Sequence, residues 1–396
     1  MRVAIIAPPW LALPVKGYGG IELVLEGLIN ELTTMGIDVE VFSNSKHLMD
    51  GVITHALYDE EQFTNIAKPM FDVLPILAAH MQYSLDKIKN DGGFDVIHDH
   101  NGFLGPELLA WATSDPTLPP VVHTLHGPPF SDESRLSQGL PDNRPFWNQL
   151  ANHMGRMYIV GISDTLMKPA SDKLREHILP TVYNAIRLEN FPFVQEKKDH
   201  FITLSRFTPD KGQHIAAKIC SKRGLELRMA GMISGIGSNN QLLSELANPN
   251  SPFLATDGFR YYKDKVLPYT IQSEKITYVG DISGPDKMKF LSEPKALLFS
   301  IDWDEPFGMV VIEALACGTP VIAMNKGAMP EIIEHGVNGF LANNEEEFEQ
   351  YIDRIDEIDP NACRKSVQDK FSAKIMAASY IDRYQQAIKL NGKNVE

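Results

Sequence analysis

The sequence predicts an α/β protein made of two doubly wound domains, each with a parallel sheet covered by helices on both faces. Short apolar runs alternate with amphipathic helical segments along its 396 residues. The runs are continuously apolar rather than alternating, which is typical of strands buried on both faces of a parallel sheet. A chain of this length suits two domains of about 200 residues and is too long for one compact core.

Ten apolar runs predict the strands of the two sheets. Those expected in the first sheet are Arg2–Ala7, Asp38–Phe42, Phe94–His98, Val121–Leu125 and Met157–Ile162. Those expected in the second sheet are Phe201–Leu204, Leu225–Ala230, Ile276–Gly280, Ala296–Ile301 and Pro320–Met324. Prolines follow the first run closely, at Pro8, Pro9 and Pro14, so we interpret this apolar start as a buried strand rather than a signal peptide.

The segments between these runs predict helices and loops. After Gly20, apolar residues recur at helical spacing until Gly36 provides a C-terminal stop. Three stretches are interpreted as loops or insertions because they lack a strand or helix pattern. They are Asn44–Asn65, Pro128–Arg144 and Ile233–Gly258.

A boundary between the domains is expected near Asn184–Asp199, where a proline and a polar run precede a fresh strand. We therefore predict domains at 1–190 and 191–370, followed by a terminal helix over 371–396, where apolar residues again recur at helical spacing. Charge is uneven across a cut after Asn190. The first part carries 13 basic and 23 acidic residues, and the remainder carries 24 and 28.

Composition and charge exclude several classes of protein. Hydrophobic residues at 43% and charged residues at 22% are globular values, and the formal net charge is −14. So acidic a chain is a poor nucleic-acid binder, and no apolar run reaches the ~18 residues of a membrane span. Cys220, Cys317 and Cys363 are odd in number and far apart, which disfavours a disulfide framework or a zinc site. We therefore expect a soluble, cytoplasmic protein.

The richest motif begins after the predicted strand Ala296–Ile301, because ligands of parallel sheets bind beyond the carboxyl ends of the strands. Glu305 follows that strand, Gly308 opens a helix, and Glu313 lies eight residues after Glu305 within the helix. Two carboxylates at this spacing can address one ligand at different heights, and ionised carboxylates accept hydrogen bonds from sugar or ribose hydroxyls. The alternative is a capping glutamate followed by a second glutamate on a solvated helix face.

The same helix start offers free backbone donors. Its first N–H groups are those of Phe307, Gly308, Met309 and Val310. Unpaired N–H groups at a helix N-terminus suit an anionic or hydroxyl-rich ligand.

A second constellation, Ser-Arg-Phe-Thr-Pro-Asp-Lys-Gly over 205–212, lies at the end of the first strand of the second domain. Arg206 and Lys211 are five residues apart across a Pro-Asp turn, and Gly212 stands at the following helix start. Two cations converging on a helix N-terminus suit a diphosphate, especially one that gains charge as a bond breaks. The alternative is that Arg206 and Lys211 are two solvated side chains on a surface loop.

A glycine-rich turn over 16–22 lies between the first strand and the first helix. Gly19 and Gly20 would let the backbone approach a ligand closely. The turn does not match a dinucleotide fingerprint, because Glu22 occupies the sixth position and the loop after Ala7 is too long, so a nicotinamide dehydrogenase is disfavoured. The alternative is a plain turn before a helix.

Histidines follow two predicted strands of the first domain. His126 precedes a glycine at the end of the fourth run, where a ligand is expected, whereas His123 is more typical of a satisfied core histidine. His98 and His100 flank an aspartate, but no other ligand set of suitable spacing accompanies them, so no metal site is predicted there. A hydrogen-bonding role for His100 stays open.

Together these motifs resemble those of the retaining glycosyltransferases of the GT-B fold, family 4. Glu305 to Glu313 resembles the family's E-x7-E motif, and the similarity extends along most of the chain through the S-R-F-x-P-x-K-G element and the glycine-rich turn. The resemblance implies two Rossmann-like domains with a cleft between them. It implies a nucleotide-sugar donor held mainly by the second domain, an acceptor held mainly by the first, and a final helix that crosses back to the first domain.

The resemblance also implies residue roles. Glu305 would hold the sugar hydroxyls, Glu313 the ribose, and Arg206 with Lys211 the diphosphate in place of a divalent metal. His126 would position the transferred sugar. We thus predict as catalytic residues His126, Glu305, Arg206 and Lys211. We predict as donor-binding residues Gly19, Gly20, Gly280, Phe307, Gly308, Met309, Val310 and Glu313.

No cofactor and no metal are expected. Asp302-Trp303-Asp304 matches the D-x-D with which sugar transferases of another fold hold manganese or magnesium, but it lies directly before Glu305 inside a different motif. The neighbouring carboxylates are therefore not interpreted as a metal site.

The sequence therefore predicts a hexosyltransferase that uses a UDP- or GDP-sugar, transfers the hexose to an acceptor hydroxyl and retains the anomeric configuration. The alternatives are a nucleotide-sugar epimerase or hydrolase on the same fold, and a non-catalytic nucleotide-sugar binding protein. The acceptor, a sugar, glycan or small molecule, is not specified by any motif. We expect the loops at 44–65 and 128–144 to select it. Because the first domain is acidic, we expect at most weak contact with an anionic membrane.

Overall fold

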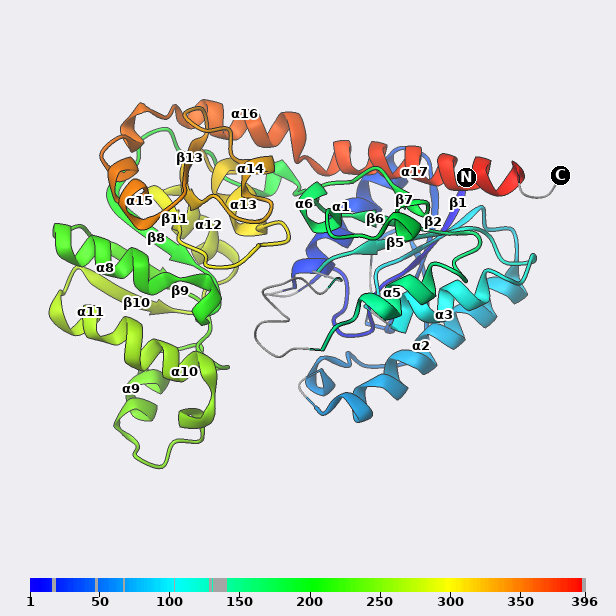
Figure 1. The fold of residues 1–396 in the computed structure, drawn as a ribbon, viewed down its shortest axis with the longest axis horizontal. Coiled ribbons are helices and arrows are strands. Elements are labelled where there is room, and N and C mark those ends of the chain that lie inside the picture. The colour runs from blue at the N-terminus through cyan, green and yellow to red at the C-terminus, as the bar shows by residue number, and fades with distance from the viewer. Residues whose placement is uncertain are drawn as a thin grey trace. The chain divides into compact units, whose positions relative to one another are not determined.

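The computed structural model describes residues 1–15, 19–46, 49–66, 68–102, 104–127, 130 and 141–393. The chain divides into two compact units. The first comprises Met1–Ile186 and Ala373–Glu396, and the second comprises Arg187–Ser372. Each unit contains one sheet with helices packed on it (Figure 1).

The first unit is built on a seven-stranded sheet in the order β3-β2-β1-β4-β5-β6-β7, in which every pairing is parallel. Its strands are β1 (Arg2–Ile6), β2 (Asp38–Ser43), β3 (Ile53–Ala56), β4 (Val96–Asp99), β5 (Val121–Leu125), β6 (Met157–Gly161) and β7 (Ile178–Leu179). Its helices include α1 (Gly20–Thr34), α2 (Met70–Asp91), α3 (Leu104–Ala112), α5 (Arg144–Leu150), α6 (Asp164–Met167), α7 (Asp172–Arg175), α17 (Ala373–Lys393) and the 3-10 turn η1 (Phe63–Asn65).

The second unit is built on a six-stranded parallel sheet in the order β10-β9-β8-β11-β12-β13. Its strands are β8 (Lys198–Leu204), β9 (Leu227–Ala230), β10 (Ile276–Gly280), β11 (Pro294–Phe299), β12 (Val321–Met324) and β13 (Gly339–Ala342). Its α-helices are α8 (Gln213–Arg223), α9 (Asn239–Ala247), α10 (Asp257–Tyr261), α11 (Leu267–Gln272), α12 (Gly284–Ser292), α13 (Met309–Ala316), α14 (Met329–Ile332), α15 (Glu345–Ile352) and α16 (Pro360–Lys370). Shorter helical turns are η2 (Leu188–Asn190), η3 (Pro209–Lys211), η4 (Pro252–Ala255), the π-helical η5 (Tyr262–Val266) and η6 (Ile355–Glu357).

The prediction of doubly wound parallel sheets is confirmed. Central strands such as β4, β5 and β6 are buried at every residue, as expected for strands covered on both faces. In both sheets the strand order reverses beside the first strand, between β1 and β4 and between β8 and β11. Such reversals separate the loops at the carboxyl ends of the two strands and create the place where ligands of these folds bind.

Two of the predicted loops are wrong in part. The stretch Asn44–Asn65 contains β3, an edge strand whose four residues alternate too little in polarity to stand out. The stretch Ile233–Gly258 contains α9, which Ser238 caps by accepting a hydrogen bond from the Gln241 N–H. Only Leu242 of α9 is buried, so the helix lacks the wide apolar stripe that would have marked it. The third stretch lies mostly outside the described residues.

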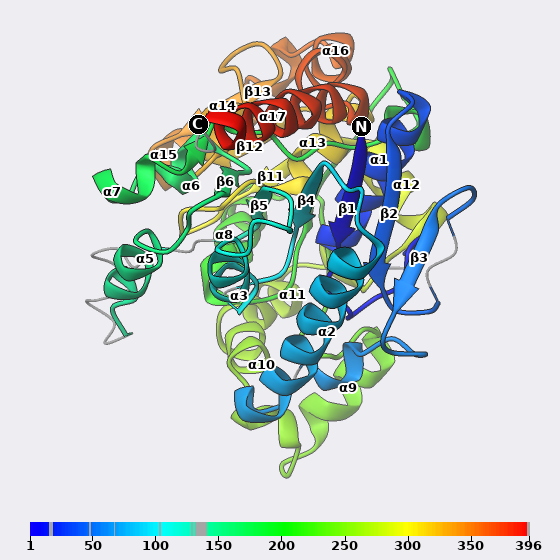
Figure 2. The ribbon, with the colours of Figure 1, turned by 90° about the vertical axis from the view of Figure 1, so that its right-hand side faces the viewer.

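The last helix, α17, is part of the first unit. It packs beside α1 and against β4 and β5 (Figure 2). The Ala373 N–H donates to the Ile186 carbonyl at 2.9 Å, where the chain re-enters the unit. Tyr380 and Tyr384, one turn apart on α17, are fully buried.

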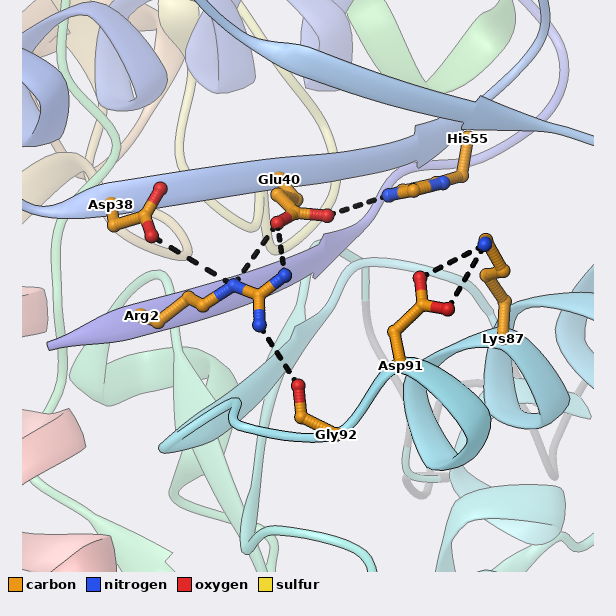
Figure 3. A network of polar contacts seen from close by, with 7 residues as sticks. All are labelled: Arg2, Asp38, Glu40, His55, Lys87, Asp91 and Gly92. Carbon is orange, nitrogen blue, oxygen red and sulfur yellow. Dashed lines mark hydrogen bonds and ion pairs between the residues drawn. The ribbon is translucent and has the colours of Figure 1, made fainter.

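An ionic network joins the first three strands of this unit (Figure 3). Arg2 donates to Glu40 at 3.0 Å and to the Gly92 carbonyl at 2.8 Å, and His55 lies 2.6 Å from the second oxygen of Glu40. The Glu40 side chain is 5% exposed. Burial acts to raise the pKa of the Glu40 carboxyl, but its hydrogen bonds with His55 and Arg2 outweigh burial and hold that pKa below its ordinary value.

This network makes the stability of the protein acid-sensitive. A carboxyl whose folded pKa is lowered stabilises the fold above its ordinary pKa of 4.5, and loses that contribution as pH falls through the folded value. Glu40→Gln should therefore lower the free energy of unfolding by about 1–2 kcal/mol at neutral pH. The difference from wild type should shrink as pH falls well below 4.5. Urea unfolding at several pH values measures both.

Glu60→Gln is the matched control, because Glu60 pairs with Lys46 at 3.1 Å on the exposed surface. Glu60→Gln should change the free energy of unfolding little at acid or at neutral pH. A Glu40→Gln deficit that is the same at acid and neutral pH would contradict the assignment.

Candidate functional site

The loops after β8 and β11 meet at the point where the second sheet reverses its strand order. Gly212 adopts a left-handed conformation (φ +63°), and a Cβ there would lie 1.9 Å from the Ser300 carbonyl oxygen. Ser300 Oγ donates to the Gly212 carbonyl at 2.7 Å, and the Asp302 N–H donates to the Asp210 carbonyl at 2.7 Å. These backbone contacts bring the predicted cation loop and the predicted carboxylate loop side by side.

Lys211 and Glu305 form an ion pair at this junction. Lys211 Nζ lies 2.5 Å from Glu305 Oε2, and the Trp303 indole N–H donates to the same oxygen at 2.9 Å. Lys211 Nζ also lies 4.5 Å from the centre of the Trp303 ring. The two charged side chains are only 12% and 13% exposed. A cation, a carboxylate and an indole thus make one compact polar cluster, which the structure assembles from two separate predicted motifs.

The backbone of Glu305 is held from the far side by the turn after β12. Gly327 adopts φ +56°, and a Cβ there would lie 2.3 Å from the Glu305 N and O atoms. The Ala328 N–H donates to the Glu305 carbonyl at 2.9 Å, and Asp304 Oδ1 accepts from the Gly327 N–H at 3.0 Å. Asp302 instead pairs with Lys326. The two aspartates of the D-x-D therefore have separate partners, a backbone amide and a lysine.

Glu313 is buried inside the unit rather than exposed on a solvated helix face, so that alternative is wrong for it. Gly308 (φ +93°) precedes α13, and no side chain caps the helix start. Glu313 Oε1 accepts from Lys287 Nζ of α12 at 2.7 Å. No motif singled out Lys287, because nothing in the chain between residues 287 and 313 indicates that the two helices pack together. Phe307 is buried at the start of the same segment.

Arg206 follows the end of β8, and Gly280 is the last residue of β10, which is separated from β8 by β9. The Arg206 side chain is exposed, and no described carboxylate forms an ion pair with it. Gly280 ends β10 with φ +96°, and its carbonyl accepts from the Gly231 N–H at 2.9 Å. Met309 and Val310 form the first turn of α13 and are partly buried.

In the first unit the predicted His126 belongs to a histidine cluster. His126 Nε2 lies 2.8 Å from His100 Nδ1. His123 is buried and its Nδ1 lies 2.7 Å from Asp99 Oδ2, so its interpretation as a satisfied core histidine is confirmed. His98 Nε2 lies 2.8 Å from Thr124 Oγ1.

The imidazoles of His98, His100 and His126 are neutral at ordinary pH. Burial, and then the nearby His123, lower the pKa of His126 to about 3. Burial and the neighbouring imidazoles also lower the pKa of His98 and of His100 well below the usual range. The first unit therefore holds hydrogen-bonding, uncharged imidazoles after its own strands, whereas the second unit holds a charged pair after its own strands.

The glycine-rich turn is described only from Gly19 onward, since residues 16–18 lie outside the described part of the chain. Gly19 is extended, and a Cβ on it would lie 2.8 Å from Val15 Cγ2. Gly20 is the first residue of α1. Burial raises the pKa of the nearby Glu22 carboxyl.

Family comparisons assign both halves of the chain. Residues 187–369 match the model described as glycosyl transferases group 1, and residues 18–187 match that of glycosyltransferase family 4. D-inositol 3-phosphate glycosyltransferase of Mycobacterium avium is 24% identical over 371 residues, covering 86% of this chain and 81% of the relative. The enzyme of the same description from Mycobacterium tuberculosis is 25% identical over 391 residues, covering 90% and 75%.

Solved structures share the fold along the whole chain. Sucrose-phosphate synthase from Thermosynechococcus elongatus is 19% identical, with a TM-score of 0.72 and coverage of 98% of this chain and 99% of that one. Anabaena HepE in complex with UDP and glucose is 18% identical, with a TM-score of 0.65 and coverage of 98% and 100%.

Three features of the described residues bear on cofactors and membranes. No group of three His, Cys, Asp or Glu side chains in the described ranges is arranged to hold a metal ion. Within the same ranges, no helix has the length and apolar character needed to cross a membrane. Cys220, Cys317 and Cys363 are free and buried.

The close contact between Gly212 and the Ser300 carbonyl leaves no room for a side chain at position 212. Gly212→Ala adds a methyl group against a backbone carbonyl and should cost about 1–3 kcal/mol more in the free energy of unfolding than a substitution with the same backbone strain alone. Gly224→Ala supplies that comparison, because Gly224 ends the same helix at φ +64° and no atom lies within 4 Å of the place its added methyl group would take. Equal losses in the two variants, measured by urea unfolding, would show that the approach is not tight.

Proposed function

Because this chain belongs to the GT-B glycosyltransferases, we propose that it transfers a hexose from a nucleotide diphosphate sugar to an acceptor hydroxyl, with retention of configuration and without a divalent metal. The observation that carries this proposal is the Lys211–Glu305 pair at the strand-order reversal of the second sheet. Ligands of such sheets bind at this position. The pair offers one group for the phosphates and one for the sugar.

The donor opens the ion pair when it binds. Lys211 exchanges the Glu305 carboxylate for the diphosphate, and the exposed Arg206 supplies a second cation. The uncapped start of α13 adds backbone donors and the positive end of a helix dipole. Two cations and a helix start neutralise a diphosphate without a metal ion.

The released Glu305 accepts hydrogen bonds from hydroxyls of the transferred sugar. It stays in place because the Gly327 turn holds its backbone and the Trp303 N–H holds one carboxylate oxygen. Glu313, fixed by Lys287, accepts from the ribose hydroxyls. Both contacts use the acceptor-only character of a carboxylate.

The reaction follows from this arrangement of charges. The bond between the anomeric carbon and the diphosphate oxygen breaks, and the acceptor oxygen forms its bond on the same face. The acceptor proton passes to the departing diphosphate oxygen. Lys211 and Arg206 stabilise the negative charge that develops there, which is the larger part of the catalysis, and positioning by Glu305 and His126 supplies the rest.

The donor and acceptor to test first come from the relatives. HepE was crystallised with UDP and glucose, and the mycobacterial relatives are described as D-inositol 3-phosphate glycosyltransferases. We propose a UDP-hexose as donor and a soluble polyol or sugar phosphate as acceptor, with the reaction taking place in the cytoplasm.

The test measures nucleotide diphosphate release from UDP-, GDP- and ADP-hexoses, with and without EDTA and with D-inositol 3-phosphate as a first acceptor. Release should survive EDTA. It should fall by about 10²–10³-fold in Lys211→Met and in Glu305→Gln, because each removes a group that acts on the transition state. Lys295→Met is the matched control: Lys295 also pairs with a carboxylate, Asp356 at 3.0 Å, but lies at the opposite end of β11.

Three outcomes would count against the proposal. Loss of release on EDTA treatment would contradict metal independence. Full activity in Glu305→Gln would remove the carboxylate from the site. Donor binding without turnover, across all acceptors and donors, would instead favour a nucleotide-sugar binding protein.

A further inference from the structure

His100 is a buried imidazole that the proposed reaction leaves unused. It lies where the first sheet reverses its strand order, and its backbone N–H donates to the Ile6 carbonyl of the neighbouring strand at 3.1 Å. His100 is 2% exposed, and its Nδ1 lies 2.8 Å from Nε2 of His126. Two neutral imidazoles at this distance share one hydrogen bond, in which one nitrogen donates and the other accepts.

The direction of this hydrogen bond follows from the other nitrogen of His100. Nε2 of His100 is buried and has no hydrogen-bond partner among the described residues. A neutral imidazole carries one N–H, and a buried N–H without a partner is more costly and rarer than an unpaired acceptor. The proton of His100 therefore belongs on Nδ1, from which it donates to His126.

The ring of His100 is held in this orientation by a buried network. The ring of His98 packs against it with centroids 4.1 Å apart. Tyr384 of α17 bonds His98 Nδ1 at 2.7 Å, and Thr124 bonds His98 Nε2 at 2.8 Å. Tyr380 of α17 in turn bonds Thr124 at 2.8 Å. The terminal helix thus fixes the stack from which His100 addresses His126.

We propose that His100 is a positioning residue that fixes His126 as the tautomer with its proton on Nδ1. His126 Nε2 accepts from His100, so Nδ1 must carry the hydrogen of the neutral ring. No described residue bonds this Nδ1, and the His126 side chain is only partly buried. His126 is therefore poised to donate a hydrogen bond to an oxygen of the transferred sugar. This last step rests on the proposed function, whereas the tautomer does not.

The first test reads the tautomer without any substrate. Long-range ¹H–¹⁵N correlation spectra of histidine-labelled protein distinguish the two neutral tautomers, and the His126 signal is identified by its absence in His126→Asn. Wild type should show His126 protonated on Nδ1. His100→Asn, whose amide can donate from nearly the same position, should keep this form. His100→Leu should lose it or give a mixture. If His100→Leu does not fold, His100→Gln replaces it. The glutamine side chain is one methylene longer than asparagine, so its amide cannot donate from the position of His100 Nδ1 and the Nδ1-protonated form of His126 should again be lost.

The second test separates kcat from KM in the same variants. His100→Leu should lower kcat by about 10-fold, the value of one neutral hydrogen bond, and leave the donor KM unchanged. His100→Asn should recover kcat to within about 3-fold of wild type. His200→Leu, which removes a buried imidazole from the second unit, is the control for the loss of a core histidine.

The outcomes separate the two proposals. An unchanged His126 tautomer in His100→Leu, or equal kcat losses in His100→Asn and His100→Leu, overturns the role of His100. If His100→Leu changes the His126 tautomer but the wild-type protein transfers no sugar, the role of His100 is supported and the proposed function is overturned.

Discussion

The second unit depends on one close backbone approach, that of Gly212 to the Ser300 carbonyl. Two loops that follow neighbouring parallel strands normally diverge where a sheet reverses its order. Here a residue without a side chain, in a left-handed conformation, lets them touch. Because Lys211 immediately precedes Gly212 and Glu305 lies five residues after Ser300, this contact sets the distance between the cation and the carboxylate.

The strand-order reversals of the two units differ in charge. In the second unit the reversal between β8 and β11 holds charged groups, which neutralise one another at close range. In the first unit the reversal between β1 and β4 holds the buried His100, which is hydrogen-bonded to His126, and loss of solvation keeps both imidazoles uncharged. Charges suit a diphosphate that departs as an anion, and neutral donors suit the hydroxyl and ring oxygens of a sugar. This division agrees with the proposed transfer reaction.

Much of this site could be predicted from sequence because its residues follow buried strands at short range. The strand runs and the E-x7-E spacing placed Glu305 and Glu313 on one loop and helix, and the resemblance connected them with Arg206 and Lys211. What sequence spacing could not show was side-chain pairing across distant segments. Neither the Lys287–Glu313 pair nor the His100–His126 hydrogen bond has a local pattern.

The missed elements have a physical reason as well. β3 is a four-residue edge strand with partly exposed side chains, and α9 buries a single leucine, so neither carries the apolar periodicity from which elements are predicted. The two tyrosines of α17 are a similar case. Apolar spacing that included Tyr384, but not Tyr380, predicted a packed helix. The hydrogen bonds of the two tyrosines to Thr124 and His98 depend on a fold that brings together residues more than 250 positions apart.

The central claim is that Lys211 exchanges Glu305 for the donor diphosphate. Calorimetric titration of the preferred nucleotide diphosphate, and of its sugar, into wild type, Lys211→Met and Glu305→Gln tests this most directly. Lys211→Met should weaken both ligands by about 10–100-fold, as expected for a charged hydrogen bond. Glu305→Gln should bind the nucleotide diphosphate at least as tightly as wild type, because its Lys211 is already free, while losing the extra affinity of the sugar. A nucleotide diphosphate that binds Glu305→Gln as weakly as it binds Lys211→Met would contradict the exchange.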